Sequence, residues 1–105
     1  MLALHVEISR FVDTHQPGWV ECRLVDAADN VHIFIEKAPV VSAAHLDATT
    51  HYPQPGLIAC TLVERRSPTT VVVDTLTPWG ISSLDDVSRF TVRSAQTIEL
   101  TRNDA

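Results

Sequence analysis

The sequence predicts an all-β protein, a small barrel or sandwich of six to seven strands. Valine, isoleucine and threonine, whose branched side chains favour extended backbone, account for 30 of the 105 residues. Apolar and polar residues alternate in several short segments, and turn-forming pairs such as Pro17-Gly18 and Pro55-Gly56 separate them. A chain of this length can bury one core, so we expect residues 1–105 to form a single domain.

The alternation places the strands in order along the chain. In the first four strands, the residues that share one face are Leu4, Val6 and Ile8; Val20, Cys22 and Leu24; Val31, Ile33 and Ile35; and Ile58, Cys60 and Leu62. The next strand, 70–76, contains three consecutive valines, which is typical of a central strand or one buried on both faces. Two more strands are predicted at 87–93 and 97–101.

A short helix is the alternative to a loop in residues 42–50. Ser42 could cap its start, and the alanines that follow favour a turn or two of helix. Such a short helix has little stability of its own, so a loop suits the segment nearly as well.

An internal repeat further predicts pseudo-two-fold symmetry. Residues 16–26 and 54–64 share six of 11 positions, and the similarity in kind extends over 16–39 and 54–78. Each unit contains a turn, a strand, a hairpin loop, a second strand and a proline. Cys22 and Cys60 occupy equivalent inward positions, and we interpret them as small buried residues near the pseudo-axis rather than as a redox pair.

The net charge of −5 restricts the partners that we expect. The eight basic residues are scattered, so no basic face is available for nucleic acid or for an anionic membrane surface. No apolar run is long enough to span a bilayer, and the start of the chain lacks the basic region of a signal peptide. We therefore expect a soluble cytoplasmic protein, with a basic protein partner as one possibility.

Three aromatic residues at turns are the candidates for partner binding. Trp19, Tyr52 and Trp79 each lie beside a proline or a glycine at the end of a strand. Aromatic side chains at a barrel rim either anchor a partner or plug the open end of the barrel. The first hypothesis is therefore a non-catalytic binding module for a protein or a small ligand, with no cofactor.

The alternative hypothesis is a small metal-dependent or histidine-based enzyme. His45, Asp47 and His51 offer metal-ligand side chains within one segment, although their spacing matches no metal motif. His5 and His32 lie on the polar faces of their strands and are expected to face solvent. The sequence contains no nucleophile elbow and no phosphate-binding loop. A third possibility is a homodimer that pairs exposed edge strands.

Overall fold

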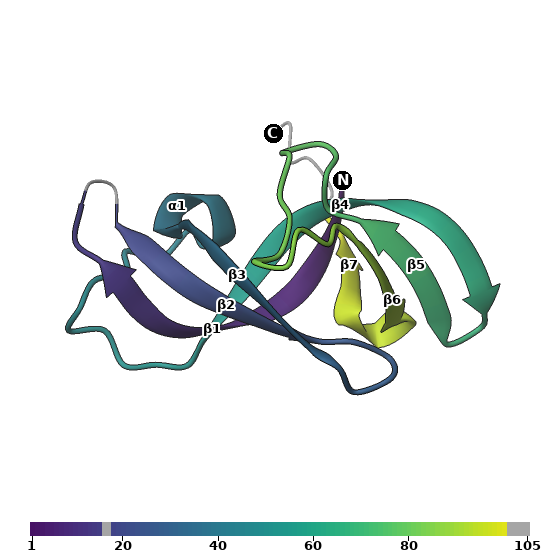
Figure 1. The fold of residues 1–105 in the computed structure, drawn as a ribbon, viewed down its shortest axis with the longest axis horizontal. Coiled ribbons are helices and arrows are strands. Elements are labelled where there is room, and N and C mark those ends of the chain that lie inside the picture. Colours follow the sequence, from purple (N-terminus) through teal and green to yellow (C-terminus); the bar gives the residue numbers. More distant parts are fainter. Residues whose placement is uncertain (16–17, 101–105) are drawn as a thin grey trace.

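The computed structural model describes residues 1–15 and 18–100 of the chain. Within these residues, seven antiparallel strands form a curled half-barrel sheet, as Figure 1 shows. The strands are β1 (Leu2–Asp13), β2 (Trp19–Val25), β3 (Val31–Lys37), β4 (Gln54–Ser67), β5 (Thr70–Asp74), β6 (Arg89–Arg93) and β7 (Thr97–Glu99). The short helix α1 covers Ala38–Val41, and the 3-10 helix η1 covers Ser94–Gln96. Neither described helix is long and apolar enough to cross a membrane.

The long strand β1 lies in the middle of the sheet and pairs with three other strands. The strand order is β3-β2-β1-β4-β5-β6, with β7 also paired to β1. One edge of β1 pairs with β4 from Leu2 to Ile8. The other edge pairs first with β7 and then, from Glu7 to Asp13, with β2. Every part of the sheet is therefore connected through β1 (Figure 1).

The core lies where the predicted apolar faces meet. The inward residues of β1 and β2 are buried as the alternation predicts, among them Leu4, Ile8 and Cys22. All three valines of β5 are also buried, and β5 lies between β4 and β6. The prediction of a central strand at this position is therefore confirmed. The seven antiparallel strands also confirm the all-β fold class that the sequence predicts.

The face of β3 that points to the core carries Phe34, and it is opposite to the face of Val31, Ile33 and Ile35 that the alternation indicates as apolar. Cys22 pairs directly with Phe34, so both side chains point to the core, and Phe34 is fully buried. His32 shares that inward face and is half-buried, so the expectation that it faces solvent is wrong. Val31, on the opposite face, is 45% exposed. The pairing register set these directions, because residues directly opposite each other in a sheet point to the same side.

The short helix lies just before the segment in which it was predicted. Pro39 occupies its first turn, where a missing N–H group costs nothing. Ser42 ends this helix by donating its N–H to the Ala38 carbonyl, so of the two alternatives for residues 42–50 the structure has the loop and not the helix capped by Ser42. Residues 42–53 instead form a loop of turns and bends, because the Asp47 carboxylate accepts hydrogen bonds from Thr49 and Thr50.

The two halves of the predicted repeat occupy comparable positions. Both β2 and β4 begin a hairpin, and both pair antiparallel with β1. Their registers differ, however, since Cys22 pairs with Ile8 and Cys60 pairs with Leu2. Six residues of extended chain correspond to about 20 Å along β1, so the two thiols are not neighbours. The duplication itself stays a prediction, and Gln16 and Pro17 lie outside the described residues.

Candidate functional site

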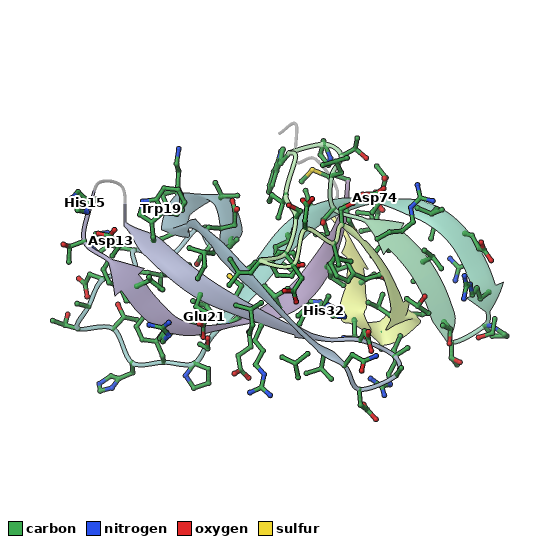
Figure 2. All side chains as sticks on the ribbon, in the orientation of Figure 1. Asp13, His15, Trp19, Glu21, His32 and Asp74 are labelled. Atoms are coloured by element: carbon green, nitrogen blue, oxygen red, sulfur yellow. The ribbon has the colours of Figure 1, made fainter. Side chains whose placement is uncertain are left out.

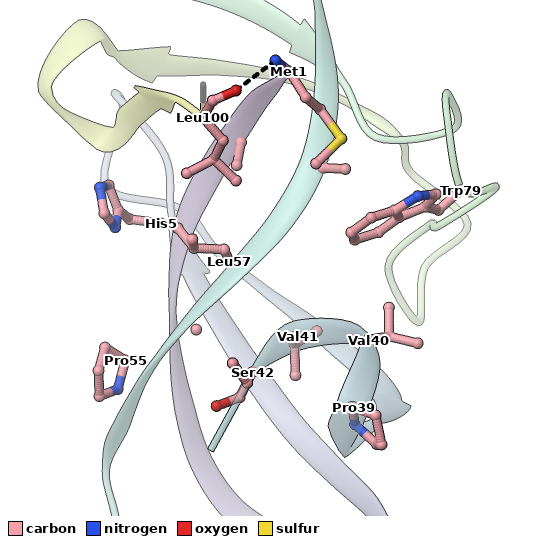
Figure 3. A pocket seen from close by; sticks show the side chains of 14 residues that line it. Met1, His5, Pro39, Val40, Val41, Ser42, Pro55, Leu57, Trp79 and Leu100 are labelled. Atoms are coloured by element: carbon pink, nitrogen blue, oxygen red, sulfur yellow. Dashed lines mark hydrogen bonds between the residues drawn. The ribbon is translucent and has the colours of Figure 1, made fainter. Parts of the chain in front are cut away.

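An apolar groove of about 500 Å³ lies on the outer face of β1 and β4. Figure 3 shows it between these strands, α1 and the loop that carries Trp79. We call it the Trp79 groove, and the residues that define it here are Ala3, His5, Val40, Leu57, Ala59 and Trp79. Its volume lies within the range of small-molecule and peptide-anchor sites, roughly 300–1,000 Å³.

Small residues on the outward face of two central strands make the floor of the groove. Ala3 of β1 pairs directly with Ala59 of β4, and His5 pairs directly with Leu57. Their side chains lie on the face of the sheet opposite Leu4 and Ile58, because side chains alternate along a strand. Ala3 and Ala59 are each only 1% exposed, so they form the covered bottom of the groove.

The loop 75–82 holds Trp79 at the rim by hydrogen bonds close to its base. We call this segment the Trp79 loop. The fully buried Thr75 hydroxyl donates to the Ile81 carbonyl at 2.7 Å, and the Ile81 N–H donates to the Thr75 carbonyl at 3.1 Å. Within the loop, the Gly80 N–H donates to the Leu76 carbonyl at 2.7 Å, and Gly80 has a φ of +68° that suits glycine. Trp79 is 48% exposed on this ordered loop.

The groove carries very little polar chemistry. No Asp, Glu, Lys or Arg side chain lines it in the described part of the chain. Among the described lining residues, His5, Ser42 and the indole N–H of Trp79 contribute the side-chain polar groups, and the Ser42 hydroxyl already accepts the Ala44 N–H at 3.1 Å. Such a surface favours an uncharged apolar group as its occupant, because a charged group would lose its hydration without a partner.

The other two aromatic candidates do not line this groove. Trp19 is half-buried beside α1, and the Lys37 ammonium lies 5.7 Å from its ring centre. Figure 2 shows Trp19 near α1 and His32 toward the far end of β3. The Tyr52 hydroxyl donates to the Asp47 carbonyl at 2.9 Å, and its ring packs against the core. Of the three predicted aromatic residues, the structure places only Trp79 at the groove.

The residues of the predicted metal site are brought together only in part. His45 Nε2 lies 3.6 Å from Asp47 Oδ2, and both side chains are well exposed. Hydrogen bonds from the Thr49 hydroxyl and N–H, and then from Thr50, hold the pKa of Asp47 below its usual value. Among residues 1–15 and 18–100, no three His, Cys, Asp or Glu side chains form a group suited to a metal, so His51 does not join this pair.

Sequence reasoning missed a polar cluster at the β2–β3 turn. Asp26 accepts hydrogen bonds from the N–H groups of Ala28 and Asn30, and its other oxygen lies 2.9 Å from His32 Nε2. The His32 ring packs edge-on against Phe90 at 4.8 Å between centres. Although partial burial alone would raise the pKa of Asp26, the hydrogen bonds from His32 and the two N–H groups lower it.

This cluster attaches the β2–β3 turn to β6. Arg93 donates to the Asp26 and Ala27 carbonyls and pairs with Asp29 at 3.0 Å. The Ala27 N–H donates to the Thr91 carbonyl at 2.9 Å. These bonds satisfy polar groups of the turn itself, so we assign the cluster a structural role, which is to hold the β2–β3 hairpin against β6.

The groove also contains residues that the sequence analysis did not single out, among them Val40, Leu57 and Ala59. One signal was present, because Leu57 and Ala59 make the outward face of a central strand apolar as well as the inward face. Comparison with models of protein families, with curated proteins and with solved structures gave no match. The function must therefore be inferred from the geometry.

Proposed function

We propose that this chain is a non-catalytic protein-binding module whose Trp79 groove receives an uncharged apolar side chain from an extended segment of a partner protein. The observation that carries the proposal is an exposed tryptophan held on an ordered loop at the rim of an apolar groove. Tryptophan is enriched among the residues that dominate binding energy, because it buries a large area at a small cost in conformational entropy.

Two further properties of the surface support this function. Two further apolar side chains are exposed, since Met1, which lines the groove, is 48% exposed and Leu76 of the Trp79 loop is 54% exposed. Exposed apolar surface of this kind is typical of protein interaction sites. The described residues that line the groove include no Asp, Glu, Lys or Arg, so its surface suits an apolar side chain of a partner.

Affinity capture with matched variants tests the proposal. The full chain is immobilised beside Leu57→Glu, which places a charge in the groove at a half-exposed position. Leu84→Glu makes the same chemical change at a residue that is 66% exposed and does not line the groove. A lysate of the source organism is applied to all three, and bound proteins are identified by mass spectrometry.

We expect a partner that binds the wild type and Leu84→Glu but not Leu57→Glu, and that binds the purified chain with the same preference in calorimetry. Replacing the interfacial leucine by a buried charge should weaken binding at least tenfold, since about 1.4 kcal/mol is tenfold in affinity. If every captured protein binds Leu57→Glu as well as the wild type, the groove is not the binding site and the proposal fails.

A further inference from the structure

The Trp79 groove adjoins a second hollow on the far side of the segment that follows α1. This hollow has a volume of about 260 Å³, and both hollows share Pro39, Ser42 and Ala43 in their lining. The second hollow also includes His45 and Leu46. One partner segment can therefore pass from the first hollow to the second across a rim only a few residues wide.

The second hollow has a carboxylate beside one of its lining residues, whereas no carboxylate lines the Trp79 groove among the described residues. His45 lines it, and the Asp47 carboxylate lies 3.6 Å from the His45 ring. The hydrogen bonds from Thr49 and Thr50 keep Asp47 in its charged form, because they stabilise the carboxylate. Among residues 1–15 and 18–100, no lysine or arginine lines either hollow, and the Lys37 ammonium lies over the Trp19 ring instead.

We infer that the segment bound in the Trp79 groove carries a lysine or arginine close to its apolar anchor, and that this basic side chain pairs with Asp47 beside His45. The inference rests on the proposed function of the groove. Charge complementarity supports it, since Asp47 is negative and the chain as a whole carries −5. An acidic segment would meet repulsion at the same place.

The residues that line both hollows, from Pro39 in α1 to Ala43 just after it, set the spacing between the two anchors. The four residues of α1 span about 6 Å along the helix, which an extended chain covers in about two residues. Allowing for the depth of each hollow, the basic residue lies about two to four positions from the apolar anchor.

Selection from a random nine-residue peptide library displayed on phage tests this recognition pattern with the full chain as bait. We expect selected peptides to share an apolar residue with a lysine or arginine about two to four positions away. Synthetic copies are then titrated against variants by fluorescence anisotropy. Asp47→Asn removes the charge but keeps the oxygen that accepts the Thr49 and Thr50 hydrogen bonds. Asp85→Asn, on an exposed residue outside both hollows, changes the net charge equally.

We expect Asp47→Asn to weaken binding about threefold to fivefold, as for an exposed ion pair, while Asp85→Asn leaves it unchanged. Selected peptides that bind through Leu57 but lack a basic residue, or that bind Asp47→Asn as tightly as the wild type, overturn this inference and leave the groove intact. Peptides that also ignore Leu57→Glu, or a library that yields no binder, overturn the proposed function together with it.

Discussion

The substitution Thr75→Val tests whether the Trp79 loop is held as the structure indicates. Valine has the shape of threonine, so the change removes the buried hydroxyl and little else. The Ile81 carbonyl then loses a donor at 2.7 Å and stays buried without it. A lost hydrogen bond that leaves a buried partner unsatisfied costs about 1–3 kcal/mol. We therefore expect the free energy of unfolding to fall by about 2 kcal/mol.

The same estimate gives a shift in Tm that is easily measured. With an unfolding entropy of roughly 2.1 cal/mol/K per residue, 2 kcal/mol lowers the Tm of a 105-residue chain by about 9 °C. Thr77→Val is the matched control, since its hydroxyl is exposed and bonds only the exposed Thr61 hydroxyl at 2.9 Å. We expect it to cost less than about 0.5 kcal/mol.

Urea and thermal unfolding followed by circular dichroism measure both variants. The wild type and both variants should unfold with the same urea m-value, so that differences in midpoint report stability alone. In a Trp19→Phe background, the fluorescence anisotropy of Trp79 should also fall in Thr75→Val, because the loop gains freedom at its base. Equal stability of Thr75→Val and Thr77→Val would show that the buried hydroxyl does not fasten the loop, and the reasoning would be wrong.

Three further predictions concern the thiols, the β2–β3 turn and metal binding. Burial raises the pKa of Cys22 to about 12 and of Cys60 to about 11, so neither should react with iodoacetamide at pH 8 until the chain unfolds; rapid alkylation of the native protein, measured by mass spectrometry, would contradict this. Because the folded-state pKa of Asp26 is lowered, its contribution to stability is complete above the unfolded value, about 3.9, and is lost as the pH falls through the folded value. Urea unfolding between about pH 2 and 5 should therefore show the free energy of unfolding rising more steeply with pH for the wild type than for Asp26→Asn. Equal slopes for the two proteins would show that the Asp26 carboxylate does not stabilise the fold. Excess ZnCl2 should leave the Tm unchanged, whereas a rise that disappears when His45 and His51 are both replaced by Ala would favour the alternative enzyme hypothesis.

The strands of this fold were predictable because their alternation is local. Leu4, Val6 and Ile8 of β1 are all buried, as their period of two predicts. In β3 the local pattern does not predict the inward face, because both faces carry apolar residues, such as Ile33 on one and Phe34 on the other. Only the pairing of Cys22 with Phe34 determines which face points inward, and pairing is a long-range property.

The sequence carried two signals of the groove, Trp79 and the apolar outward face at Leu57 and Ala59. A tryptophan between a proline and a glycine indicates an exposed turn, which the sequence shows directly. The floor depends on Ala3 and Ala59, which are 56 positions apart and become neighbours only through the register of β1 with β4. The helix that lines the groove was not predicted at its place, because the sequence offered Ser42 as a helix cap whereas α1 covers Ala38–Val41, with Pro39 in its first turn.

The central position of β1 determines the order in which the chain can fold. The β1–β2, β2–β3 and β4–β5 pairs join neighbouring segments and can form early, whereas the first half of β1 must find β4 and β7 far along the chain, with Leu2 opposite Cys60 and Glu99. Such distant pairing makes folding slow, on the order of milliseconds to seconds for all-β domains. Until β7 arrives, the edge of β1 at Leu2–Leu4 offers unpaired backbone groups, and nascent or partly unfolded chains are exposed to aggregation there.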